Sequence, residues 1–157
     1  MGLIQSLTQA IFSNLIREDR YMLLVDGLGV TLQITFFALI LGILIGILVT
    51  VCRLLNLKIL APIAKLYVDI IRGTPAVVQL ILIYYAILGS STLPKVLVAS
   101  VAFGINSGAY MSELIRGGIQ AVDRGQMEAA RSLGMGWSMA MVRIIIPQAI
   151  KNILPAL

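Results

Sequence analysis

Long apolar blocks alternate with short basic connections along most of this chain. The first block runs from Leu28 to Cys52 without an ionisable residue. Twenty-five residues at 1.5 Å each reach about 37 Å as a helix, enough to cross the hydrocarbon core of a bilayer with some tilt. Gly42 and Gly46 stand four residues apart within it, a spacing that predicts close packing against another helix.

Two further apolar blocks follow the first. The second extends from Leu66 to about Leu88, and after a turn at residues 89–95 the third extends from about Val96 to Ile115. Residues 137–157 are too polar and too rich in proline for a simple span, and they predict a helix that climbs from the cytoplasmic surface and is incomplete at Leu157. The pattern predicts an all-α, polytopic helical transmembrane protein with three clear spans, a partial C-terminal helix and a cytoplasmic coupling helix.

The first 25 residues differ from these blocks. They lack the basic start of a signal peptide. A helical stripe followed by the polar break at residues 17–20 predicts a periplasmic or interfacial helix that lies along the membrane surface. The residues of the stripe are Leu3, Ile4, Leu7, Ala10, Ile11, Asn14 and Leu15.

The composition of the chain argues against a metal-binding or ATP-hydrolysing function. Hydrophobic residues make up 59% of the chain, charged residues make up 12%, and the mean hydropathy is +0.99. There is no histidine and Cys52 is the single cysteine, so we expect no metal site and no cofactor. The sequence contains no Gly-x-x-x-x-Gly-Lys-Ser/Thr, so the chain does not hydrolyse ATP through a P-loop of its own, and we expect no enzymatic activity.

The net charge of +5 accompanies no basic run and no aromatic stacking module, which argues against nucleic acid as a partner. The basic residues lie instead in the connections. Residues 53–65 carry three basic and no acidic side chains, and residues 116–143 carry four basic side chains against Asp123 and Glu128. The positive-inside rule therefore predicts both connections in the cytoplasm and the N-terminus outside.

Two acid–arginine pairs share the pattern acid-x-x-Arg-Gly. They are Asp69 with Arg72 and Glu113 with Arg116. Side chains three residues apart meet on a helix, and two antiparallel spans would bring both pairs to one depth near the cytoplasmic mouth. We interpret them as a polar latch; the alternative is arginines that snorkel toward the membrane surface with local partners.

A break in the second block, at Gly73-Thr74-Pro75, predicts a new half-helix. Proline disfavours the helical conformation at Thr74, which could then cap a helix that begins at Pro75. Gln79 follows one turn later, and Asn106 and Ser107 lie at a similar depth on the third block. These four polar residues predict a substrate-binding cavity, although a plain proline kink with packed polar residues remains the alternative.

A short polar helix is predicted from Gln126 to Leu133, with Gly134 as a left-handed end residue. Ala129, Ala130 and Leu133 would form one face small enough to enter a groove on a partner, with Glu128 on the polar side. An ordinary loop helix is the alternative.

These segments resemble a known family. Glu128-Ala129-Ala130, Gly134, Ile144 and Ile146-Pro147 resemble the EAA motif of the membrane subunits of binding-protein-dependent ABC importers. Residues 67–75 with Gln79, and residues 106–113 with 115–120, resemble the second-span and third-span signatures of permeases for polar amino acids. Asp69 stands where glutamate is usual and Ile146 where leucine is usual, and both changes keep the chemistry. The resemblance runs from about Gly27 to Leu157.

The resemblance implies a permease subunit of an ATP-driven importer for polar amino acids of the glutamine, arginine or histidine type. It implies a multi-pass location in a bacterial inner membrane, with residues 26–157 as a transmembrane domain incomplete at its C-terminus. The implied partners are an ATPase dimer that binds the ATP, a second permease subunit, an external solute-binding protein and membrane lipid. The alternatives are a passive channel, which needs no docking helix, and a membrane scaffold, which needs no polar residues at the midplane.

Overall fold

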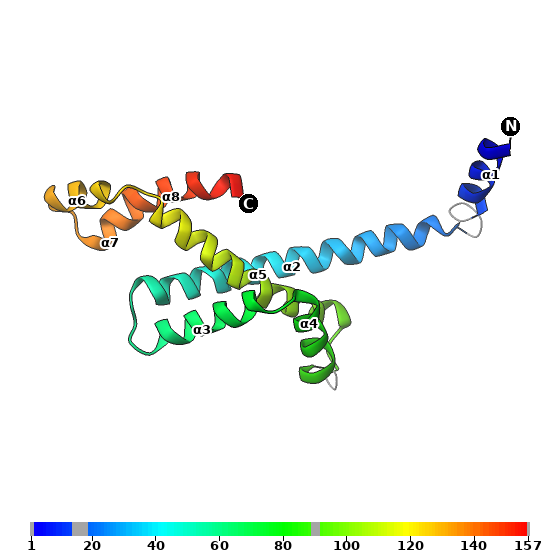
Figure 1. Cartoon of the computed structure of the whole chain (residues 1–157), viewed down its shortest axis with the longest axis horizontal. Helices are drawn as coiled ribbons and strands as arrows, with labels where there is room; N and C mark the ends of the chain where they lie inside the picture. Colours follow the sequence, from blue (N-terminus) through cyan, green and yellow to red (C-terminus); the bar gives the residue numbers. More distant parts are fainter. Residues whose placement is uncertain (1, 14–18, 89–91, 157) are drawn as a thin grey trace.

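The chain folds into helices (Figure 1). The structure is a computed structural model that describes residues 2–13, 19–88 and 92–156, and no strand occurs in these ranges. The all-α prediction is confirmed. The α-helices are α1 Gly2–Ile11, α2 Tyr21–Leu54, α3 Leu60–Gly73, α4 Ala76–Ile81, α5 Lys95–Gln120, α6 Arg124–Ser132, α7 Trp137–Ala140 and α8 Ile146–Ile153. Two π-helical segments, η3 Leu82–Ile87 and η4 Met141–Ile145, extend α4 and join α7 to α8, and a 3₁₀ turn, η5 Leu154–Ala156, follows α8.

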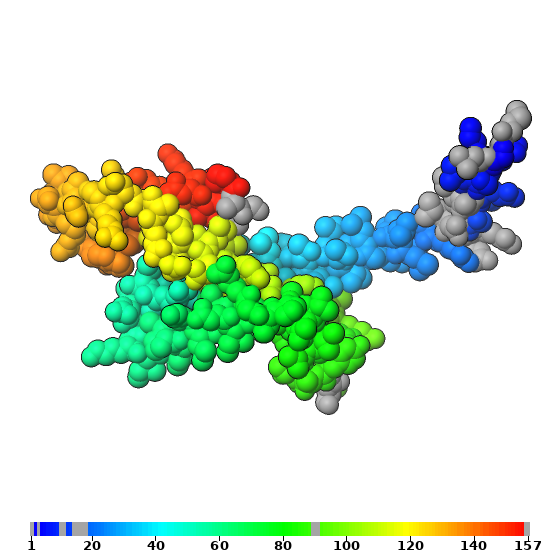
Figure 2. All heavy atoms as spheres, in the orientation of Figure 1, coloured from blue at the N-terminus to red at the C-terminus, as the bar shows by residue number. Residues whose placement is uncertain are grey.

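Helix α2 is longer than the predicted first span. It begins at Tyr21 rather than Leu28, so the predicted boundary between residues 25 and 26 falls inside a continuous helix. It ends where Asn56 adopts a left-handed conformation with φ of 49°, which asparagine tolerates better than most residues. Figure 2 shows its N-terminal part projecting alone from the body of the molecule.

The predicted N-terminal helix is present as α1. Ile4 and Leu7 of the predicted stripe are exposed. Asn14, Leu15, residues 17 and 18 of the predicted polar break and residues 89–91 of the predicted turn lie outside the described residues.

Helices α2 and α5 run in parallel and touch closely along their small residues. A Cβ atom added at Gly46 would lie 2.7 Å from Cβ of Met111, and one added at Gly108 would lie 2.7 Å from Cβ of Ile45. The side chain of Thr50 donates hydrogen bonds to the carbonyls of Gly46 and, across the interface, of Ser112. The close packing predicted from Gly42 and Gly46 is therefore confirmed. Helix α3 completes this layer through a core of Val49, Ala64, Val68 and Ala109.

The second predicted span is sharply broken. The chain bends by 108° between α3 and the segment that begins with α4, at Thr74 and Pro75. Thr74 is extended, with φ of −119° and ψ of 144°. This is the conformation that a following proline imposes, because its ring clashes with a helical residue before it.

The spans differ from the three clear ones expected. By length and composition, α2 is the one helix in the described ranges able to cross a membrane by itself, and α3 with the α4 segment qualifies only as a bent pair. Helix α5 does not qualify. Its apolar sequence is interrupted by Asn106, Glu113 and Arg116, which lower its mean hydropathy.

The C-terminal helices fold onto the end of α5. Val122, Ile145 and Ala149 form their buried core. A Cβ atom at Gly118 would lie 2.3 Å from Cγ1 of Ile153, so a side chain there would separate α8 from α5. The helix predicted within 137–157 is thus present, with Pro147 near the start of α8, directly after the π-helical segment η4.

The α2–α5 contact gives a stability prediction. We expect Gly46→Ala to lower the free energy of unfolding by about 1–3 kcal/mol, because the new methyl overlaps Cβ of Met111, which cannot move without its backbone. Thermal unfolding in detergent micelles measures the effect. Gly29→Ala, on the same helix with nothing within 4 Å, is the matched control and should not lower stability. Equal loss in both variants would contradict the packing argument.

Candidate functional site

A buried glutamine on α4 makes hydrogen bonds to the end of α3, across the break between the two helices. The side-chain amide nitrogen of Gln79 on α4 lies 2.6 Å from the carbonyl of Ile71, 3.0 Å from the carbonyl of Thr74 and 2.6 Å from Oγ1 of Thr74. Its Oε1 accepts a hydrogen bond of 2.9 Å from Nδ2 of Asn106 on α5. Only 7% of Gln79 is exposed. The structure therefore brings together three of the four predicted substrate residues, Thr74, Gln79 and Asn106, which we call the amide cluster.

Thr74 does not cap the new half-helix as predicted. Its hydroxyl donates back to the carbonyl of Ile70 at 2.9 Å, while Pro75 occupies the N-cap position of α4 without a side-chain hydrogen bond. A threonine at the end of a helix readily bonds to the carbonyl four residues earlier, and it here satisfies an otherwise unpaired acceptor of α3. The cap prediction was wrong because it considered only the helix that follows.

Ser107, the fourth predicted substrate residue, lies apart from the amide cluster. It faces α2, where a Cβ atom at Gly42 would lie 2.8 Å from its own Cβ. It also lines a cavity of about 430 Å³ with Thr31, Thr35 and Phe103. Consecutive helical residues point about 100° apart, so Asn106 and Ser107 serve different faces of α5.

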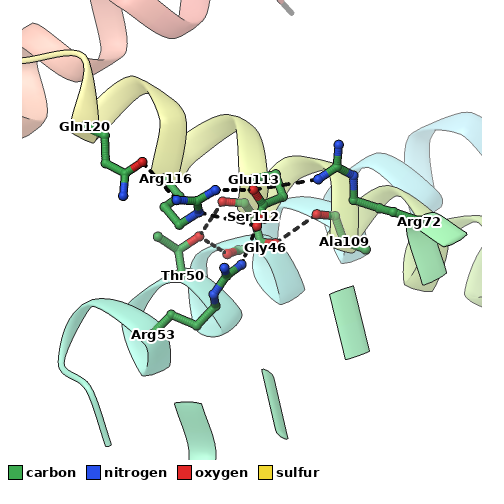
Figure 3. A network of polar contacts seen from close by, with 9 residues as sticks. All are labelled: Gly46, Thr50, Arg53, Arg72, Ala109, Ser112, Glu113, Arg116 and Gln120. Carbon is green, nitrogen blue, oxygen red and sulfur yellow. Dashed lines mark hydrogen bonds and ion pairs between the residues drawn. The ribbon is translucent and has the colours of Figure 1, made fainter. Parts of the chain in front are cut away.

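One carboxylate gathers three arginines from three helices (Figure 3). Glu113 of α5 pairs with Arg53 of α2, with Arg116 at 2.6 Å and with Arg72 of α3 at 3.7 Å. We call these four residues the ion-pair cluster. The predicted latch is therefore centred on Glu113, and two of its predicted members, Arg72 and Arg116, meet there.

Asp69 is not part of this cluster. It is exposed and makes no ion pair with any residue that the structure describes. The prediction paired it with Arg72 by helical spacing, but the Arg72 side chain turns toward α5 instead. The equivalent spacing does hold for Glu113 and Arg116.

Arg53 is the cluster member that the sequence reasoning missed as a site residue. Its charge served only to orient the chain in the membrane. The signal lay in its position in the last turn of α2, two turns after Gly46, but its pairing depends on the parallel register of α2 and α5.

Helix α6 has the predicted end. Asp123 accepts a hydrogen bond from the backbone of Gly125 at its start. At its end Gly134 has φ of +84°, and the amides of Gly134 and Met135 donate back to the carbonyls of Arg131 and Ala130. These two bonds form a Schellman motif, so the role of Gly134 as a left-handed end residue is confirmed.

The predicted docking face of α6 needs one correction. Ala130 is 2% exposed and packs inside the chain, whereas Leu133 is 83% exposed. Glu128 and Ala129 are also exposed. The exposed members of the predicted face are therefore Ala129 and Leu133, one turn apart, and we call these two residues the docking face. Ala130 fails as a member because its position on the helix turns it toward the rest of the chain.

Residues 38–157 match the model of a protein family described as the binding-protein-dependent transport system inner membrane component. This chain belongs to that family. It is therefore a membrane transport component rather than an enzyme, and its system depends on a binding protein. The family does not favour the alternatives of a passive channel or a scaffold.

Individual relatives agree. The chain is 41% identical over 150 residues to a Rickettsia bellii protein named as a putative glutamine transport system permease. This match covers 94% of this chain and 69% of that protein. It is 39% identical over 136 residues to the arginine transport system permease protein of Bacillus subtilis, covering 85% and 62% of the two chains. A solved structure described as an amino acid ABC transporter with histidines matches with a TM-score of 0.74 and 45% identity, over 86% of this chain and 67% of that one. The chain thus spans about two thirds of the length of these relatives.

The ion-pair cluster predicts unequal roles for two carboxylates in the same sequence pattern. Glu113→Gln should lower the free energy of unfolding by about 2–4 kcal/mol, because it leaves three neighbouring guanidinium groups without their carboxylate. Asp69→Asn, the matched control, should leave stability unchanged. Thermal unfolding of the two variants in detergent measures these stabilities. An equal loss of stability in both would contradict the unequal roles of Glu113 and Asp69.

Proposed function

We propose that this chain is a multi-pass permease subunit of an ATP-driven importer that carries amino acids into a bacterial cell. The observation that carries the proposal is the match over nearly the whole chain to permeases named for glutamine and arginine transport. The basic connections at residues 53–65 and 116–143 support a topology with both inside and the N-terminus outside.

The proposed assembly contains an ATPase dimer, a second permease subunit that is identical or related to this one, and an external solute-binding protein. The permease holds no cofactor of its own, and ATP binds to the ATPase subunits. Alternating access then comes from closure of the ATPase dimer, transmitted to the helices that line the cavity.

Transmission begins at the docking face of α6. Leu133 stands out from the surface beside the Schellman turn, a shape that suits insertion into a groove on the ATPase. The opposite side of α6 is fixed to the chain through buried Ala130 and through Gln126, which accepts a hydrogen bond from Gln148 of α8. Movement of the docking face is therefore passed to α8 and, through the contact of Ile153 with Gly118, to α5.

The amide cluster is the proposed substrate site. The amide hydrogens of Gln79 are used within the chain, where they hold the α3–α4 bend. Asn106 donates to Gln79, and among the described residues its Oδ1 accepts no hydrogen bond. That oxygen, on α5 beside the α3–α4 bend, can accept a hydrogen bond from the ammonium group of an amino acid. The ion-pair cluster, nearer the cytoplasmic end of α5, is the proposed latch that closes the path below it.

The docking proposal predicts a defect in coupling. Truncation of an anchoring side chain at an interface costs more than about 1 kcal/mol, so Leu133→Ala should weaken co-purification of the ATPase at least fivefold or leave ATP hydrolysis uncoupled from uptake. Leu154→Ala is the control, because Leu154 is also exposed, at 62%, but lies outside α6. Normal assembly and coupling in Leu133→Ala would show that α6 docks elsewhere. Ala130→Trp is a poor test because it would disrupt packing inside the chain.

The substrate proposal is tested by uptake of radiolabelled L-glutamine and L-arginine into proteoliposomes that contain the whole transporter. Asn106→Ala and Thr74→Val should each raise the apparent KM about tenfold with normal subunit assembly, since each removes a hydrogen-bonding group of the amide cluster. Thr35→Val is the matched control, because Thr35 makes the same bond to the carbonyl four residues earlier but lies on α2. If the wild-type transporter takes up neither amino acid, the proposed substrate class is wrong. If uptake is unchanged in both variants, the site lies elsewhere.

A further inference from the structure

The ion-pair cluster holds more positive charge than its carboxylate can compensate. Three guanidinium groups, from Arg53, Arg72 and Arg116, surround the single carboxylate of Glu113. Two positive charges are therefore left without a partner in the cluster. A charged group in a membrane-embedded helix is costly unless an opposite charge or a water-filled cavity compensates it.

Arg72 is the arginine least committed to Glu113. Arg53 and Arg116 make direct hydrogen bonds to the carboxylate, whereas the nearest nitrogen of Arg72 is 3.7 Å away. The exposed fraction of the side chain is 44% for Arg72, against 31% for Arg116 and 19% for Arg53. Figure 3 shows Arg72 approaching from the side of Glu113 opposite to Arg116. Its guanidinium group is thus the one open to a further anion.

Tyr110 fixes the place of that group. The guanidinium carbon of Arg72 lies 5.5 Å from the centre of the Tyr110 ring, within the range of a cation–π contact. Tyr110 is itself 49% exposed. The ring supports one face of the guanidinium and leaves its outer edge, with its parallel N–H groups, available to a carboxylate.

This pair lies on the same face of α5 as the proposed substrate site. Asn106, Tyr110 and Glu113 follow one another at four and three residues, the spacing of a single helical stripe. All three contact α3 or α4, through Gln79 for Asn106 and through Arg72 for the other two. At 1.5 Å per residue, Tyr110 is about 6 Å along the helix from Asn106, toward the cytoplasmic end. The Arg72 guanidinium therefore lies between the amide cluster and the Glu113 carboxylate.

We propose that Arg72, supported by the ring of Tyr110, binds the α-carboxylate of the transported amino acid. The inference deepens the proposed function and rests on it: Asn106 offers an acceptor for the ammonium group, and Arg72 offers the cation for the carboxylate. Because the contact between Arg72 and Glu113 is long, Arg72 can bind the substrate. Arg53 and Arg116 then continue to neutralise the carboxylate of Glu113.

The test compares an amino acid with the same molecule lacking its negative charge. Binding of radiolabelled L-glutamine and L-arginine to the permease–ATPase complex in lipid nanodiscs is measured without the solute-binding protein, which would add its own selectivity. Each is competed with the unlabelled acid and with its α-carboxamide. The wild-type complex should prefer the acid by tenfold or more, the size expected of a hydrogen-bonded charge pair.

In Arg72→Gln the affinity for the acid should fall about tenfold while the affinity for the carboxamide stays the same, so the preference disappears. Lys65→Gln, which removes a cation from the same helix two turns away, should keep the preference. An Arg72→Gln complex that still prefers the acid would overturn the proposal, because Arg72 would then serve Glu113 or a lipid phosphate.

Two further variants decide the question if Arg72→Gln does not assemble. Arg72→Lys keeps the charge but loses the planar fork, and Tyr110→Leu removes the ring beneath it; both should reduce the preference for the acid several-fold. An unchanged preference in both overturns the proposal. A wild-type complex that binds acid and carboxamide equally overturns this inference alone, whereas failure of the whole transporter to take up either amino acid overturns the proposed function with it.

Discussion

The close approach of α2 and α5 is the constraint on which the other contacts depend. Glycines on both helices remove the side chains that would hold the backbones apart, so the two helices lie in parallel and in one register. That register places Thr50 against the Ser112 carbonyl and Arg53 against Glu113. A shift by one residue would turn Glu113 away from Arg53, whereas Arg116, on the same helix as Glu113, would stay paired with it.

Polar groups in this chain are placed where the helices break or meet. The bend after Gly73 leaves backbone carbonyls at the end of α3 without helical partners, and in an apolar environment such acceptors must be satisfied inside the protein. Gln79 and Thr74 satisfy them, and Asn106 connects the bend to α5. The residues that stabilise the bend therefore also make it polar, which is why the proposed substrate site coincides with the contacts that hold the bend.

Local features of this fold were predictable from the sequence, and features that depend on register were not. The break at Thr74-Pro75 and the left-handed Gly134 follow from the conformational limits of proline and glycine, and both are present. The small residues of α2 likewise identified a packing face without naming its partner. By contrast, helical spacing alone treated Asp69 and Glu113 as equivalent, although only Glu113 faces the arginines of other helices. The burial of Ala130 and the orientation of Ser107 toward α2 depend in the same way on how each helix is rotated, which its contacts with neighbouring helices decide.

The length of α2 has a consequence for the surface opposite its basic end. Its 34 residues extend about 51 Å at 1.5 Å per residue, well beyond the roughly 30 Å of a hydrocarbon core. With Arg53 at one boundary, Asp26 lies about 40 Å away along the helix, past the other boundary even with moderate tilt. With that placement of Arg53, the first turns of α2 would lie in the headgroup region and in water. Shortening α2 by two turns between Asp26 and Arg53 would bring Asp26 to the edge of the lipid tails.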